Sequence, residues 1–251
     1  MVHIVGAGPG DPELITVKGR RYLEEADVVI YAGSLVNPAL LAVCREDAVI
    51  HNSAKMTLDE VLAVIAEAEA AGKMTVRLHT GDPAIYGAIQ EQMDAMAKKG
   101  IAYDVVPGVS SFLAAAAALR QEYTLPGISQ TVIITRQPGR TPVPEREQLR
   151  ARAAHQSTMC IFLSITMLET VVAELIAGGY AEDTPIAIVQ KASWPEQKIV
   201  RGTLATIVAK VEGAKIDRTA MIVVSHCLGA DYELSRLYAP EFSHMFRKAS
   251  R

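Results

Sequence analysis

The chain contains little of what several protein classes require. Its three cysteines, Cys44, Cys160 and Cys227, lie far apart, and none has the close spacing of a metal-binding or redox pair. We therefore expect no disulfide framework and a reduced, cytoplasmic setting. No apolar segment reaches the roughly 18 residues of a membrane span, and the amino-terminal residues lack the pattern of a signal peptide.

An excess of positive charge is also missing. A nucleic-acid-binding surface normally concentrates Lys and Arg, whereas the formal net charge here is −3. We therefore expect a small-molecule ligand, and neither nucleic acid nor a membrane as a partner. With 50% hydrophobic residues, the chain of 251 residues can bury a sizeable core.

No complete phosphate-binding motif is present either. Residues 5–12 (VGAGPGDP) follow an apolar run and form a glycine-rich turn, but Asp11 stands where the dinucleotide motif G-x-G-x-x-G ends in glycine. Pro9 lacks an N–H group and Asp11 adds negative charge, so the turn suits a pyrophosphate poorly. The turn therefore favours a ligand without phosphate, or has a purely structural role.

What the sequence does contain is an alternation of short β-rich segments and longer helical patterns, which is typical of βαβ units. In the first half, the expected strands are residues 3–5, 28–31, 75–79 and 103–106. The expected helices there are residues 57–72, which start with the capping-box pair Thr57 and Glu60, and residues 85–100.

A break at residues 125–129 (LPGIS) separates the second half. Its expected strands are residues 131–135, 159–164, 185–190, 198–201 and 219–225, and its helices start near Glu145, Met167 and Leu204. The close succession of the last three strands predicts a mixed sheet. The fold class is therefore α/β, with an amino-terminal domain over residues 1–122 and a carboxy-terminal domain over residues 123–251.

Three turns that contain glycine follow expected parallel strands: residues 6–12, 80–87 (TGDPAIYG) and 107–111 (PGVSS). Because parallel strands end at one edge of a sheet, we expect these turns to converge and to form a cofactor site. Asp82 is also expected to cap a helix with Pro83 in its first turn. His79 is expected to have its hydrogen bonds satisfied, with contact to the substrate as the alternative. Trp194 is expected to be buried in the core or at an interface, with packing against the substrate as the alternative.

At these turns the sequence resembles the tetrapyrrole methylases, and the resemblance covers nearly the whole chain. The shared motifs are residues 6–11, 14–19 (LITVKG), 80–83 and 107–111. Three further strings resemble the branch that methylates C-11 of precorrin-4: residues 31–36 (YAGSLV), 135–136 with 139–144 (GRTPVP), and 191–195 (KASWP). The chain departs from relatives that methylate uroporphyrinogen at Ala32, where those relatives carry an acid.

The resemblance implies two α/β domains with a cofactor cleft between them, and a C-methyltransferase that uses S-adenosylmethionine and releases S-adenosylhomocysteine. It implies cofactor contacts at Pro9, Gly81, Asp82, Ile85, Ser110, Ser111, Leu163, Ala192, Thr219 and Ala220. The implied substrate is the tetrapyrrole cobalt-precorrin-4 of corrin and cobalamin biosynthesis, and the implied assembly is a homodimer. Metal-free precorrin-4 stays open as the substrate, and a nucleotide-binding oxidoreductase is a more remote alternative.

A corrin precursor carries acetate and propionate arms, so its site needs cations. Guanidinium groups bind carboxylates through two parallel hydrogen bonds. The candidates are Arg136, Arg140, Lys191 and Arg201. Arg140 ranks first because it lies in a segment rich in proline and glycine. We expect no catalytic acid or base, because a sulfonium activates its own leaving group. We expect no protein-bound metal either, because the macrocycle would chelate any cobalt in the substrate.

Overall fold

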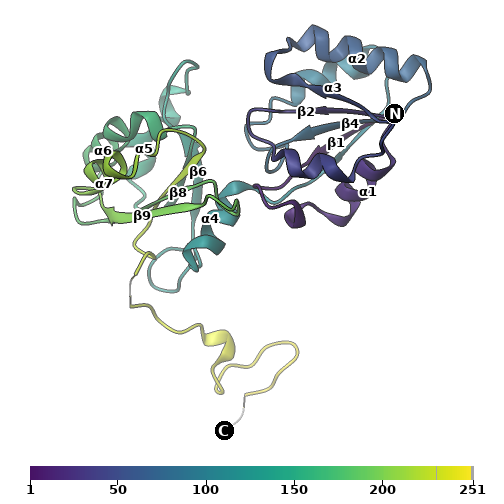
Figure 1. Ribbon diagram of the computed structural model, residues 1–251. Coiled ribbons are helices and arrows are strands. Elements are labelled where there is room, and N and C mark those ends of the chain that lie inside the picture. Colours follow the sequence, from purple (N-terminus) through teal and green to yellow (C-terminus); the bar gives the residue numbers. More distant parts are fainter. Residues whose placement is uncertain (230, 250–251) are drawn as a thin grey trace. The chain divides into compact units, whose positions relative to one another are not determined.

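The structure is a computed structural model that describes residues 1–229 and 231–249. Its contacts divide the chain into two compact units. The first unit comprises Met1–Ala115 and Lys191–Lys198, and the second comprises Ala116–Gln190 and Ile199–Arg251. Each unit is an α/β structure with its own five-stranded sheet (Figure 1), which confirms the predicted fold class. The domain division after residue 122 stays a prediction.

The sheet of the first unit is parallel throughout, with the strand order β3-β2-β4-β1-β5. The strands are β1 (Val2–Gly6), β2 (Val28–Tyr31), β3 (Val49–Asn52), β4 (Thr75–His79) and β5 (Tyr103–Val106). Val5 pairs with Leu78 on one side and with Val106 on the other, so the carboxyl ends of β1, β4 and β5 lie side by side. The sequence did not predict β3, because this edge strand is mostly exposed and lacks a buried apolar run.

Helices cover both faces of the first sheet. The helices on this sheet are α1 (Val17–Glu25), α2 (Leu58–Ala70) and α3 (Gln90–Lys98), with 3-10 turns η1 (Pro12–Leu14), η2 (Pro38–Val43) and η3 (Ser53–Lys55). Helix α4 (Ser111–Leu119) follows β5 and continues from the first unit into the second. Helices α2 and α3 pack on one face with Ile4 and Ile30, whereas α1 packs on the other face with Val5 and Leu78 (Figure 1). The strands are therefore buried on both sides, as in other parallel sheets.

The helix predicted over residues 85–100 starts later in the structure, at Gln90. Tyr86 and Ala88 have φ angles of 55° and 50°, which a right-handed helix cannot accommodate. Residues 80–89 therefore form an irregular turn. The predicted helix cap at Asp82 is wrong for the same reason: its Oδ1 accepts a hydrogen bond from Ala84 N at 2.8 Å within this turn.

The sheet of the second unit is mixed, as predicted, and its strand order is β6-β7-β10-β8-β9. The strands are β6 (Val132–Arg136), β7 (Thr158–Phe162), β8 (Pro185–Gln190), β9 (Lys198–Thr203) and β10 (Ala220–Val224). Strands β6 and β7 run parallel, and β10 is antiparallel to both β7 and β8. Helices α5 (Leu149–Ala153), α6 (Leu168–Ala177) and α7 (Ile207–Ala214) pack on this sheet, and 3-10 turns η4 (Glu145–Glu147), η5 (Ile165–Met167) and η6 (Arg236–Tyr238) complete the unit.

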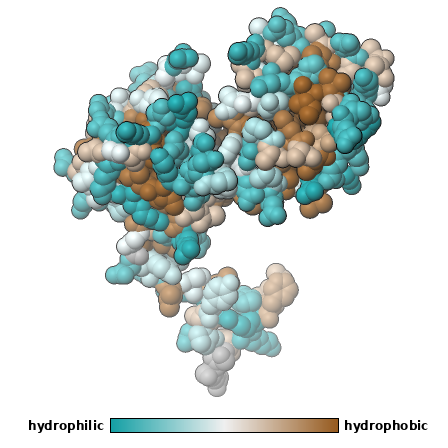
Figure 2. All heavy atoms as spheres, viewed as in Figure 1, coloured by the Kyte–Doolittle hydropathy of each residue, from teal (hydrophilic) through white to brown (hydrophobic). Residues whose placement is uncertain are grey.

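The exterior of both units mixes hydrophilic and apolar residues on the face seen in Figure 2. The large apolar side chains that are most exposed include Val17 in the first unit and Leu234, Met245 and Phe246 near the carboxyl end. Within residues 1–229 and 231–249, no helix has both the length and the apolar character needed to cross a membrane.

Candidate functional site

The three turns that follow β1, β4 and β5 are joined by backbone hydrogen bonds. Gly81 N donates to Gly8 O at 2.8 Å, and Gly8 N donates to Gly81 O at 3.2 Å. The Asp82 carboxylate accepts a hydrogen bond from Gly108 N at 2.9 Å, which ties the second turn to the third. The predicted convergence of the three turns at one edge of the sheet is therefore confirmed.

Glycine is required where the turns touch. A Cβ atom on Gly6 would lie 2.6 Å from Gly108 Cα, and a Cβ atom on Gly108 would lie 2.1 Å from Gly81 O. The backbones of the three turns are thus packed directly on one another. Gly81 differs, because its φ is +60° and a Cβ atom there would face Ser110 Cα at 3.6 Å. The interlocked backbones form a rigid platform, on which Gly81 is a position where a Cβ atom would make ordinary contacts without a clash.

Most of the predicted cofactor residues of the first unit lie on this platform. Pro9 is buried in the first turn, and Gly81 and Asp82 form the second. Ile85 closes the second turn through a hydrogen bond from its N to Asp82 O at 3.3 Å. The third turn contributes the buried Ser110 and the half-buried Ser111, which starts α4.

Ala192 also belongs to the first unit, although it lies far from the three turns in the sequence. It is 6% exposed and belongs to the segment Lys191–Lys198, which lies with the first unit although the flanking strand β8 belongs to the second. In the same segment, Trp194 Nε1 donates a hydrogen bond to Pro9 O at 2.9 Å. Trp194 is half-buried against the first turn, which the sequence analysis did not predict. No local signal links residues so far apart.

His79 ends β4 directly before the second turn, and its environment differs from the one predicted. The side chain is 5% exposed, and its Nε2 has no hydrogen-bond partner among the described residues. Burial, with a smaller contribution from the positive charge of Arg77, lowers the pKa of His79 to about 3. The prediction that His79 is satisfied is therefore wrong, and the residue is neutral at physiological pH.

Arg77 precedes His79 on the same side of β4 and is also buried, at 7% exposure. Its guanidinium donates to Gln92 Oε1 at 3.0 Å and to Ile30 O at 3.1 Å. Burial lowers the pKa of Arg77 to about 10, so it keeps its charge at neutral pH. The positive charge of Arg77 opposes protonation of the His79 imidazole.

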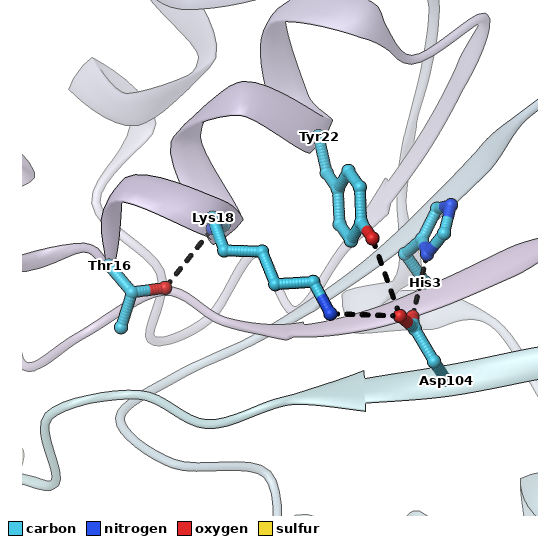
Figure 3. Close-up of polar contacts among 6 residues, drawn as sticks. His3, Thr16, Lys18, Tyr22 and Asp104 are labelled. Atoms are coloured by element: carbon cyan, nitrogen blue, oxygen red, sulfur yellow. Dashed lines mark hydrogen bonds and ion pairs between the residues drawn. The ribbon is translucent and has the colours of Figure 1, made fainter.

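A polar cluster anchors the helix that follows the first turn (Figure 3). Asp104 on β5 is contacted by His3 Nδ1 at 2.6 Å, by Lys18 Nζ at 3.2 Å and by the Tyr22 hydroxyl at 3.4 Å. Burial alone raises the pKa of Asp104, but hydrogen bonds from His3 and Lys18 outweigh it and hold the pKa below its usual value. Because Lys18 and Tyr22 lie on α1, the cluster fixes α1 against β5.

In the second unit, sheet register brings several predicted residues to one edge. Arg136 pairs with Phe162, the residue before Leu163, across the parallel strands β6 and β7. In the antiparallel pair, Ile222 lies opposite Ile161, so the start of β10 at Ala220 lies at the end of β7. Arg136, Leu163 and the Thr219–Ala220 pair therefore share one edge of the second sheet.

Backbone strain marks two of these positions. Leu163 has a φ of 53° and is 63% exposed, although its side chain is large and apolar. Thr219 has a φ of 50°. Left-handed conformations are costly for residues other than glycine and tend to cluster at functional sites. The strain is thus consistent with a ligand contact at the predicted positions.

The four predicted substrate cations have different partners. Arg136 donates to Thr141 O at 3.2 Å and to Pro142 O at 2.7 Å, so it holds its own loop in place. Arg201 donates to Leu119 O at 2.8 Å, at the end of α4. Lys191 Nζ lies 3.4 Å from Glu196 Oε2. Arg140 is exposed and forms no hydrogen bond or ion pair with the described residues, so its guanidinium is free to bind a ligand.

The sequence is similar over most of its length to one protein family and to relatives of known function. Residues 1–208 match the family model Tetrapyrrole (Corrin/Porphyrin) Methylases. A cobalt-precorrin-4 C(11)-methyltransferase of Methanocaldococcus jannaschii is 57% identical over 251 residues, which cover 100% of this chain and 97% of the relative.

Solved structures give the same result. A cobalt precorrin-4 methyltransferase superposes with a TM-score of 0.89 at 47% identity, and the match covers 91% of this chain and 96% of that one. A uroporphyrin-III C-methyl transferase of Thermus thermophilus, in complex with S-adenosylhomocysteine, superposes with a TM-score of 0.75 at 28% identity. That match covers 90% of this chain and 92% of the other.

Proposed function

Because the chain belongs to the tetrapyrrole (corrin/porphyrin) methylase family, we propose that it transfers a methyl group from S-adenosylmethionine to C-11 of cobalt-precorrin-4. The observation that carries this proposal is the full-length similarity to the M. jannaschii relative, whose name states this reaction. The reaction belongs to corrin and cobalamin biosynthesis. We further infer that the enzyme acts in the cytoplasm as a homodimer, as the family resemblance implies.

The chemistry of the first unit fits a cofactor that is cationic and lacks phosphate. In the first turn, Pro9 has no N–H group and Asp11 N donates to Ser193 Oγ at 3.0 Å, so neither amide is available to an anion. Asp82 adds a carboxylate at the same edge, and negative charge attracts a sulfonium or an ammonium group. Pro9, Gly81, Asp82, Ile85, Ser110 and Ser111 are the residues of this unit that would hold S-adenosylmethionine.

The residues act mainly by positioning. When bound, S-adenosylmethionine would supply an activated methyl group, because its positively charged sulfur would keep the electron pair of the broken C–S bond and leave as a neutral thioether. The three interlocked turns would hold S-adenosylmethionine, and the free guanidinium of Arg140 would pair with a carboxylate arm of the corrinoid. Alignment of two reactants contributes about 7–11 kcal/mol to catalysis in favourable cases. No side chain needs to transfer a proton to the leaving group.

Substrate choice is tested by assaying the purified enzyme with cobalt-precorrin-4 and with metal-free precorrin-4, each with S-adenosylmethionine. We expect methylation at C-11 and a higher kcat/KM for the cobalt-containing substrate. A higher kcat/KM for metal-free precorrin-4 would reverse the substrate assignment. Calorimetry provides a second test, because S-adenosylhomocysteine should bind whereas NAD should not. Binding of NAD alone would identify a different class of enzyme.

Replacement of Arg140 tests the substrate site. Arg140→Ala removes a guanidinium that is free to pair with a carboxylate, and we expect KM for the corrinoid to rise about tenfold. The affinity for S-adenosylhomocysteine should stay unchanged. Arg146→Ala is the matched control, because Arg146 is also exposed and lies only six residues further along the chain. An unchanged KM in Arg140→Ala would remove this residue from the site.

A further inference from the structure

The segment Lys191–Lys198 forms hydrogen bonds with the first turn, although the two are far apart in the sequence. Trp194 Nε1 donates to Pro9 O at 2.9 Å, and the two residues are 185 positions apart. Ser193 Oγ accepts a hydrogen bond from Asp11 N at 3.0 Å. Two adjacent side chains of this segment therefore bind two backbone groups of the turn.

The indole of Trp194 also sets which residue fits at the centre of the turn. A Cβ atom on Gly10 would lie 2.0 Å from both Cδ1 and Nε1 of Trp194. Such a distance is far shorter than any van der Waals contact, and the obstacle is a large aromatic ring. Gly10 and Trp194 are thus a sterically matched pair.

The turn is held by side chains from outside it. Gly10 O accepts a hydrogen bond from Asn37 Nδ2 at 2.8 Å, in addition to the bonds at Pro9 and Asp11. Pro9 has no N–H group to contribute. The backbone conformation of residues 9–11 is consequently fixed by hydrogen bonds to Trp194, Ser193 and Asn37. These outside partners satisfy backbone groups that few hydrogen bonds within the turn could satisfy.

The segment Lys191–Lys198 itself has an unusual backbone conformation. Lys191 and Ser193 have φ angles of 47° and 71°, and Ser193 N donates to Gln197 Oε1 at 2.8 Å. Lys191 Nζ lies 5.2 Å from the centre of the Trp194 ring and pairs with Glu196. Strain of this kind persists only where surrounding contacts impose it, and it often accompanies function.

We propose that Trp194 is a positioning residue for the cofactor, which fixes residues 9–11 in the shape that binds S-adenosylmethionine. This inference rests on the proposed function, and it assigns the role to a residue that the sequence places far from the turn. Trp194 acts through Pro9 and Gly10. Its loss should therefore affect the binding of the cofactor more than that of the corrinoid.

Calorimetry with S-adenosylhomocysteine tests the hydrogen bond. Trp194→Phe keeps an aromatic ring but leaves the buried Pro9 carbonyl without its donor, and we expect Kd to rise at least fivefold. KM for S-adenosylmethionine should rise likewise, with kcat and KM for the corrinoid changed less than twofold. Tyr180→Phe is the matched control, since it removes an aromatic donor to the Ser157 carbonyl in the second unit. A Kd within twofold of the wild type in Trp194→Phe would overturn the inference.

A double-mutant cycle tests the steric pairing. Gly10→Ala should weaken binding of S-adenosylhomocysteine in the wild-type background, because its Cβ atom displaces the indole. The loss should be clearly smaller in a Trp194→Ala background, where the ring is absent and only the cost of the Gly10 backbone conformation, with a φ of +159°, remains. Equal losses in both backgrounds would refute the pairing. Thermal unfolding of each variant is the check that the protein remains folded.

The fluorescence of Trp194 gives an independent readout, because it is the only tryptophan in the chain. Its emission should change on addition of S-adenosylhomocysteine and saturate at the Kd found by calorimetry. Binding without any change in emission would contradict the proposed role of Trp194 in cofactor binding. Failure of the wild type to bind S-adenosylhomocysteine would instead contradict the proposed function.

Discussion

Among single residues, Gly81 offers a sharp test of the candidate cofactor site. Its φ of +60° favours glycine, and a Cβ atom there would project toward Ser110 and Ser111 without a clash. Gly81→Ala should therefore destabilise the fold by about 1 kcal/mol through its backbone conformation. Its methyl group should also weaken binding of S-adenosylhomocysteine at least tenfold, as measured by calorimetry.

Gly72 provides the matched control for this substitution. Its φ of +68° imposes the same conformational cost, but a Cβ atom there has no neighbour within 4 Å. Gly72→Ala should lose about as much stability and bind S-adenosylhomocysteine normally. Equal affinities in the two variants would mean that Gly81 does not face the cofactor.

The low pKa of His79 predicts how the stability of the protein depends on pH. The pKa of His79 is about 3 in the folded protein, whereas an unfolded histidine titrates near 6.5, so the unfolded chain binds the proton more readily. Stability should therefore fall as the pH decreases below about 6.5. Between pH 7 and pH 5, the wild type should lose roughly 2 kcal/mol more than His79→Leu in urea unfolding.

The variant His79→Leu also tests how the unpaired Nε2 of His79 affects stability. At pH 7, His79→Leu should be neutral or stabilising, because it removes a buried polar atom that lacks a partner. Parallel stability curves for the wild type and the variant from pH 7 to pH 5 would show that His79 titrates normally in the folded state.

Among the structural elements, α2 shows how a local sequence pattern becomes a structure. Thr57 Oγ1 accepts a hydrogen bond from Glu60 N, and the Glu60 carboxylate accepts one from Thr57 N at 2.7 Å. Thr57→Ala should lower the free energy of unfolding by about 1 kcal/mol, measured in urea. Thr170→Ala at the exposed third position of α6, a helix without a side-chain cap, should be neutral or stabilising, because alanine has the higher helix propensity. Equal effects of the two changes would argue against a contribution from the cap.

Elements with a strong local signal were predicted well. Strand β8 spans Pro185–Gln190, as the sequence indicated, and the capping box located the start of α2. The start of α3 was predicted too early, because the conformations of Tyr86 and Ala88 depend on the packing of the turn rather than on apolar periodicity. Edge strand β3 was missed because one exposed face gives no hydrophobic pattern.

For the whole molecule, ligand binding should appear as added stability. A ligand that binds only the folded protein stabilises it by about 2.7 kcal/mol at a concentration one hundred times its Kd. S-adenosylhomocysteine should therefore raise the midpoint of thermal unfolding, and NAD at the same concentration should not. Hydrogen exchange should show the protection at residues 80–87 and 107–111. Protection by NAD instead would contradict the proposed cofactor.

The sequence by itself determined the α/β class, the mixed second sheet and the three glycine turns, because each depends on neighbouring residues or on a short repeating pattern. The same holds for the motifs at residues 80–83 and 139–144, which pointed to the family. Predictions about single site residues such as Leu163 and Arg140 remain to be tested by substitution.

Only the tertiary structure decided which groups became partners. Three features depend on contacts that the local sequence pattern does not specify. They are the hydrogen bond from Trp194 to Pro9, the unpaired Nε2 of His79, and the hydrogen bonds by which Arg136 holds its own loop. Such contacts are set by sheet register and by the packing of turns, where a shift of one residue changes every partner. Local periodicity carries no information about that choice.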